Sequence, residues 1–87
     1  MNGLELTLLG KPDCHLCHAM RAVVETVLPE FGASLVEKDV RADPETERLY
    51  LLDIPVLLLG EREVARHRVG ADDLRRRLVD LGLFRTS

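Results

Sequence analysis

The sequence predicts an α/β fold in the order β-α-β-α-β-β-α, with a mixed four-stranded sheet and helices on both faces. Short apolar or alternating segments, which are typical of strands, alternate along the chain with segments whose apolar residues follow helical spacing. Strands joined through helices prefer right-handed parallel crossovers. The last two strands are close enough along the chain to form an antiparallel hairpin, so the sheet is expected to be mixed.

The first half of the chain supplies a strand, a helix and a second strand. Residues 4–9 alternate and then run apolar, as expected of a buried strand, and residues 10–13 form a turn. Residues 16–28 carry apolar side chains at helical spacing, and Pro29 with a following glycine ends this helix. Residues 33–40 are alternating and β-branched, which predicts the second strand.

The second half begins with a short helix at residues 43–50, where an aspartate that can cap precedes a proline suited to the first helical position. A short apolar strand follows at residues 56–59, and a turn leads into a polar strand at residues 62–68. After Gly70, the last helix is defined by three leucines at helical spacing: Leu74, Leu78 and Leu81.

Composition limits the class of protein. The 87 residues, 46% hydrophobic and 31% charged, predict one globular domain over residues 1–87 and not a disordered chain. A net charge of −3, with one Tyr, two Phe and no Trp, argues against nucleic-acid binding. The longest apolar run, residues 55–59, is too short for a membrane span. Because residues 1–6 lack an export pattern, we expect a cytoplasmic protein, and we expect a monomer.

The two cysteines of the chain, Cys14 and Cys17, form a C-x-x-C motif, and His18 extends it to C-x-x-C-H. The first pattern is typical of disulfide-exchange enzymes and the second of covalent haem attachment. Cys14 falls at the start of the first predicted helix, where unpaired N–H groups and the helix dipole stabilise a reactive thiolate. Cys17 falls one turn later on the buried side, near Met20. This placement predicts an exposed attacking thiol and a sheltered resolving thiol.

Three other interpretations of the cysteines stay open. Haem attachment requires His18 as an axial ligand and an export compartment, and the sequence carries no export pattern. A metal site requires about four ligands, so a zinc ion or an iron–sulfur cluster would have to be bridged by the cysteines of two chains. That would make the protein a binding module. In the third interpretation, the protein is an interaction domain whose two cysteines have no function.

A proline stands at the start of the third predicted strand, in the sequence Asp53-Ile54-Pro55-Val56. Proline cannot donate to a strand ladder, and prolines tolerated at such places are often cis and hold the backbone in an exposed geometry. Taken alone, the residue favours a simple loop proline at the entry to an edge strand.

Together these motifs resemble the glutaredoxin-like branch of the thioredoxin superfamily over nearly the whole chain. The matching residues are Lys11 to Cys17, Ile54-Pro55-Val56 and Val69 to Leu74. The resemblance implies a thioredoxin-like βαβαββα fold, a cis Ile54–Pro55 bond facing the dithiol, and Cys14 and Cys17 as the attacking and resolving cysteines. It also implies that glutathione or substrate is held by these candidate binding residues, to which His15 is added for its charge: Lys11, His15, Ile54, Pro55, Gly70 and Asp72.

The chain departs from the usual glutaredoxin pattern at several positions. His15 and Leu16 lie between the cysteines instead of Pro-Tyr, as in a small bacterial glutaredoxin-like group. Val69 replaces the first residue of the usual Gly-Gly, and Asp53 puts a negative charge where the family usually has threonine. These changes leave dithiol chemistry intact and disfavour the binding of anionic glutathione.

The resemblance therefore implies a thiol–disulfide oxidoreductase that reduces protein or glutathione mixed disulfides through Cys14 and Cys17. No bound cofactor and no metal are expected, and glutathione is a candidate co-substrate. The expected partners are a disulfide-containing protein or small thiol, and glutathione or a thioredoxin-reductase-like protein as reductant.

Overall fold

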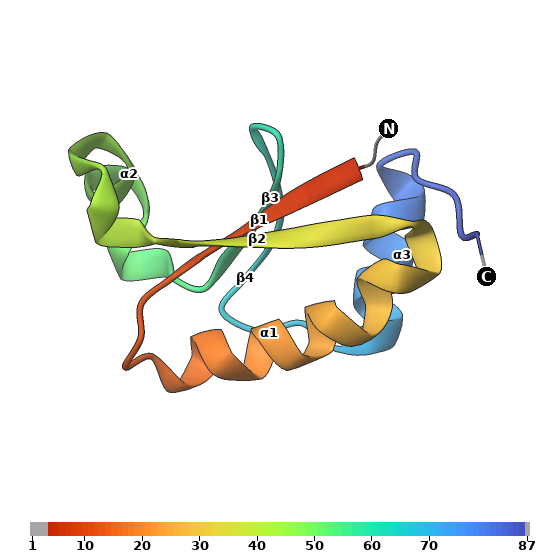
Figure 1. Cartoon of the computed structure of the whole chain (residues 1–87), viewed down its shortest axis with the longest axis horizontal. Helices are drawn as coiled ribbons and strands as arrows, with labels where there is room; N and C mark the ends of the chain where they lie inside the picture. The colour runs from red at the N-terminus through yellow and green to blue at the C-terminus, as the bar shows by residue number, and fades with distance from the viewer. Residues whose placement is uncertain (1–3, 87) are drawn as a thin grey trace.

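The computed structural model describes residues 4–86 and contains the predicted element order, built on a four-stranded sheet with strand order β2-β1-β3-β4 (Figure 1). The strands are β1 (Leu4–Gly10), β2 (Ala33–Asp39), β3 (Val56–Leu59) and β4 (Arg62–Arg66). The α-helices are α1 (His15–Val27), α2 (Pro44–Tyr50) and α3 (Ala71–Asp80). Three short 3₁₀ helices complete the chain: η1 (Leu28–Phe31), η2 (Val40–Ala42) and η3 (Leu51–Asp53).

The sheet is mixed, as predicted, but only the connection through α1 is a parallel crossover. β2 runs parallel to β1, while β3 runs antiparallel to β1 and β4 antiparallel to β3. A seven-residue helix such as α2 spans only about 10 Å, whereas a seven-residue strand spans about 23 Å. Helix α2 alone therefore does not return the chain along the sheet, and β3 enters from the opposite end, antiparallel to β1.

The main core lies between one face of the sheet and helices α1 and α3. Leu6 and Leu8 of β1 point into this core, and α3 contributes Leu74 and Leu78, both completely buried. Burial of each such side chain contributes roughly 1.5–3 kcal/mol relative to exposure. The buried side of α1 follows the predicted helical spacing: Cys17, Met20, Val24 and Val27.

Helix α2 covers part of the other face of the sheet, which confirms the prediction of helices on both faces. Its Thr46 and Tyr50 line a cavity together with Thr7 and Leu9, the β1 residues that alternate with the core leucines. The helix begins as predicted, because the Asp43 carboxylate accepts a 3.0 Å hydrogen bond from the Thr46 backbone N–H.

Two strand ends differ from the prediction. β4 ends at Arg66, not at residue 68, because His67 adopts a left-handed backbone conformation with φ of 65° that no strand can continue. β2 ends at Asp39, because its carboxylate accepts a 2.8 Å hydrogen bond from the Arg41 backbone N–H and starts η2 at Val40.

Candidate functional site

Cys14 and Cys17 form a disulfide at the N-terminus of α1, with their Cα atoms 5.2 Å apart. Cys14 is the N-cap residue of the helix, and its sulfur accepts a 3.1 Å hydrogen bond from the backbone N–H of Cys17. Cys14 is partly exposed, whereas Cys17 is only 5% exposed. The predicted asymmetry between an accessible and a sheltered sulfur is therefore present in the geometry.

The turn before α1 fixes the position of the Cys14 sulfur. The Cys14 backbone N–H donates to the carbonyl of Lys11, and the Cys14 carbonyl accepts the first helical hydrogen bond from His18, both at 3.2 Å. Gly10 lets the sheltered sulfur sit against β1, since a Cβ at Gly10 would lie 2.9 Å from the Cys17 sulfur. The first turn of the helix contains no acidic residue, so its dipole faces the cysteines without a carboxylate on the helix itself.

Charged side chains surround the disulfide on the β2 side. Lys11 is partly buried and lines a cavity of about 210 Å³ that also contacts Cys17, His18 and Arg21. Asp39 borders the same cavity, and hydrogen bonds from Arg41 lower the pKa of its carboxyl to about 2, with a smaller contribution from the charge of Lys11. Lys11, one of the charged residues predicted to lie near the dithiol, thus lines the same cavity as the buried Cys17.

The proline loop has the cis peptide bond that the resemblance implies, while its orientation towards the dithiol stays a prediction. The Ile54–Pro55 peptide bond is cis, and Ile54 is extended, with φ of −64° and ψ of 148°. The Pro55 carbonyl accepts a 2.8 Å hydrogen bond from the backbone N–H of His67. Asp53 is held from the end of β4, because its carboxylate lies 3.1 Å from the Arg66 guanidinium. The loop is therefore tied to the residues that follow β4.

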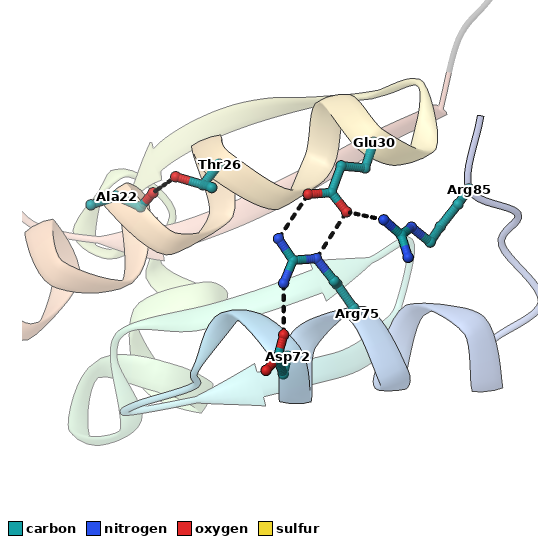
Figure 2. A network of polar contacts seen from close by, with 6 residues as sticks. All are labelled: Ala22, Thr26, Glu30, Asp72, Arg75 and Arg85. Carbon is teal, nitrogen blue, oxygen red and sulfur yellow. Dashed lines mark hydrogen bonds and ion pairs between the residues drawn. The ribbon is translucent and has the colours of Figure 1, made fainter. Parts of the chain in front are cut away.

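Asp72 is exposed to solvent at the start of α3. Its carboxylate accepts a hydrogen bond from Arg75, whose guanidinium also donates two 2.8 Å hydrogen bonds to Glu30 (Figure 2). Arg85 completes this network at 3.2 Å from Glu30. Asp72 thus takes part in a structural network that joins α3 to η1 and the C-terminal segment.

Asp73, the residue after Asp72, lies along a cavity between α3 and α1. It lines a cavity of about 400 Å³ together with Gly70 and Leu16, the residue directly before Cys17. Gly70 is the N-cap of α3, and Asp73 lies three residues later on the side of the helix that lines the same cavity. The helical spacing from Gly70 therefore places Asp73, and not Asp72, on the side of α3 that lines this cavity.

The same cavity brings in residues that the sequence analysis had not assigned to the site. Ala19, Met20 and Val23 of α1 form its apolar side, and the chain from His67 to Gly70 forms the opposite side. Figure 1 shows this segment after β4 passing alongside the middle of α1 on its way to α3. A positive φ at a histidine gives no sequence signal, so this arrangement was not predictable from the residues.

Within residues 4–86, no group of three or more His, Cys, Asp or Glu side chains is placed to hold a metal ion. A zinc or cluster site would need ligands from a second chain, and this two-chain module stays a prediction. None of the described helices has both the length and the apolar character required to cross a membrane.

Comparisons with known proteins agree with this geometry. Residues 5–79 match the family model described as Glutaredoxin-like domain. A structural-genomics target protein from X. campestris is similar at 30% identity and a TM-score of 0.71, over 86% of this chain and 96% of that chain. No curated protein sequence matches at a significant level.

Two further solved structures are similar in fold. Thioredoxin 1 from Thermosipho africanus has a TM-score of 0.63 at 18% identity, over 90% of this chain and 93% of its own. Glutaredoxin from Brucella melitensis has a TM-score of 0.57 at 24% identity, over 94% of this chain and 85% of its own. Both likenesses confirm the predicted thioredoxin-like fold.

Proposed function

Because this chain belongs to the glutaredoxin-like family, we propose that it is a thiol–disulfide oxidoreductase that reduces protein or glutathione mixed disulfides through Cys14 and Cys17. The observation that carries the proposal is the position of the Cys14 sulfur, partly exposed at the N-terminus of α1 and hydrogen-bonded by the Cys17 backbone N–H. In the reduced protein the same N–H and the helix dipole stabilise a thiolate on Cys14.

The reaction is an exchange in two steps. The Cys14 thiolate attacks one sulfur of the substrate disulfide, the substrate S–S bond breaks, and the departing thiolate takes a proton from solvent. Cys17 then loses its proton and attacks the Cys14 sulfur, which releases the second substrate thiol and forms the Cys14–Cys17 disulfide. Two electrons pass to the substrate. Two molecules of glutathione, or a thioredoxin-reductase-like protein, return two electrons to the enzyme.

The surrounding residues have roles that follow from their positions. Lys11 places positive charge in the cavity that also contacts Cys17, and His15 follows Cys14 at the start of α1. The extended backbone at Ile54, followed by Pro55, is available to pair with the substrate as an added strand. Gly70 leaves open space at the start of α3, since a Cβ at Gly70 would meet no atom within 4 Å.

Intact mass after equilibration over a series of reduced-to-oxidised glutathione ratios tests the proposal, with free thiols trapped by alkylation. We expect the wild type to convert between dithiol and internal disulfide at a cytosol-like poise. Cys17→Ser should accumulate a mixed disulfide on Cys14, whereas the matched Cys14→Ser variant should accumulate none. A pair of cysteines that stays reduced at every ratio, or equal trapping by both variants, contradicts the mechanism.

A further inference from the structure

A groove lies between α1 and the segment that follows β4. Its floor is apolar and is formed by Leu16, Met20, Val23 and Val69. We call this cavity of about 400 Å³ the α1 groove; its volume lies within the range of pockets that bind small molecules. Leu16 lies between the two cysteines in the sequence, so one lining residue of the groove belongs to the C-x-x-C motif.

Arg68 lies at the rim of the α1 groove and gives the groove a positive charge that no carboxylate in the described part of the chain pairs with. Arg68 is exposed, and among residues 4–86 no carboxylate lies within ion-pair distance of it. The neighbouring arginines are paired: Arg66 contacts Asp53 and Glu63, and Arg77 contacts Asp73. The carboxylate of Asp73, which also lines the groove, is therefore already neutralised from α3.

Building on the proposed function, we propose that the α1 groove binds the polypeptide next to the substrate cysteine. An apolar side chain adjacent to that cysteine enters the floor, and an acidic side chain further along pairs with Arg68. The substrate class is thus a protein disulfide flanked by apolar and acidic residues. Glutathione has no apolar side chain to fill the floor, so it lacks one of the two features that the groove matches.

The test uses four short peptides, each with one cysteine linked to 2-mercaptoethanol as a mixed disulfide. The residue next to the cysteine is Leu or Ser, and a residue beyond it is Glu or Lys. We expect the reduced wild type to show its highest kcat/KM for the Leu and Glu peptide. Arg68→Glu should reverse the order of the Glu and Lys peptides, changing their ratio roughly tenfold, because an attractive exposed ion pair becomes a repulsive one.

Two variants provide controls. Arg62→Glu makes the same change of charge on an exposed residue at the other end of β4, outside the groove, and should keep the wild-type preference for Glu. Val23→Ser changes the partly buried floor and should lose the preference for Leu over Ser while keeping the preference for Glu. A thermal unfolding curve for each variant verifies that it is folded.

Bis(2-hydroxyethyl) disulfide separates this inference from the proposed function. If it is reduced, and the four peptides react equally in wild type and Arg68→Glu, the groove inference is wrong while the oxidoreductase proposal stands. If no disulfide is reduced, both are wrong. An Arg68→Glu effect that is equal for glutathione disulfide and the Leu and Glu peptide assigns the groove to glutathione and also overturns the inference.

Discussion

The backbone N–H of His67 donates a 2.8 Å hydrogen bond to the carbonyl oxygen of Pro55. His67 makes this contact from a left-handed backbone conformation, with φ of 65°, which residues other than glycine rarely adopt. The proline loop is thus held by the backbone of a residue whose conformation is itself unfavourable. The fold keeps this conformation because it also directs residues 67–70 towards α1.

A β-branched residue at position 67 should be poorly tolerated. We expect His67→Val to lower the free energy of unfolding by about 1–2 kcal/mol, since a side chain with a branched Cβ is strained at positive φ. His67→Gly removes the strain and gains unfolded-state entropy, so it should stay within about 1 kcal/mol of the wild type. Urea denaturation measures both variants, and a Val variant as stable as the Gly variant contradicts the strain argument.

Gly10 should resist even the smallest substitution. A Cβ at this position would lie 2.9 Å from the Cys17 sulfur and 3.1 Å from its Cβ, so Gly10→Ala forces the sheltered cysteine to move. We expect the free energy of unfolding to fall by roughly 1–3 kcal/mol, as in other overpacked sites, and the second step of exchange to slow.

Gly70→Ala is the matched control for Gly10→Ala, because a Cβ at Gly70 meets no atom within 4 Å and its φ is −87°. Its unfolding midpoint in denaturant should remain near that of the wild type. Equal losses of stability in the two variants would show that the contact with Cys17 is not the cause.

Stability should fall as acid protonates Asp39. Hydrogen bonds from Arg41 lower the pKa of this carboxyl from 3.8 to about 2 in the folded protein. A group with a lowered folded-state pKa adds stability that is complete above its unfolded pKa and disappears as the pH falls through the folded value. We expect Asp39→Asn to be less stable than the wild type at neutral pH, with the difference shrinking between pH 3.8 and 2.

Melting temperatures of the wild type and Asp39→Asn, measured from pH 7 to pH 2, test this prediction. Glu61→Gln, an exposed turn residue with no ion pair among residues 4–86, serves as the control and should track the wild type throughout. If the difference between Asp39→Asn and wild type does not change with pH, the hydrogen bonds from Arg41 do not stabilise the fold.

The Glu30–Arg75 pair should matter more than the ion pairs on helix surfaces. Both side chains are partly buried, and the fork of two 2.8 Å hydrogen bonds joins η1 to α3 across 45 residues of sequence (Figure 2). Arg75→Lys keeps the charge and loses the fork, so the melting temperature should fall by a few degrees. Arg48→Lys, in an exposed pair with Glu45, should leave it unchanged.

The sequence predicted the elements whose signals are local. Helix α2 begins at the predicted proline because Asp43 caps it within three residues, and the Cys14 cap of α1 follows equally from a local turn. The burial of Cys17 followed from helical spacing alone. In each case the residues that determine the conformation are neighbours in the chain.

Other features depend on contacts between distant residues and had no local signal. Arg75 stands in a run of three arginines on α3, and its guanidinium binds Glu30 of another element. The binding role of Asp72 stays a prediction; the structure places Asp73, one residue later on α3, along the groove, and pairs Asp72 with Arg75. The role of residues 67–70 depends on one backbone angle that the identity of residue 67 does not reveal.

The strand order β2-β1-β3-β4 leaves β2 and β4 each with a single neighbour, so both present unpaired backbone groups to solvent. Such strands invite pairing with another copy of the chain, and charged side chains on them oppose it. β2 carries exposed Glu37 and Lys38, and β4 carries exposed Arg62, Glu63 and Arg66. The charged side chains thereby disfavour the growth of the sheet by an added strand at either border.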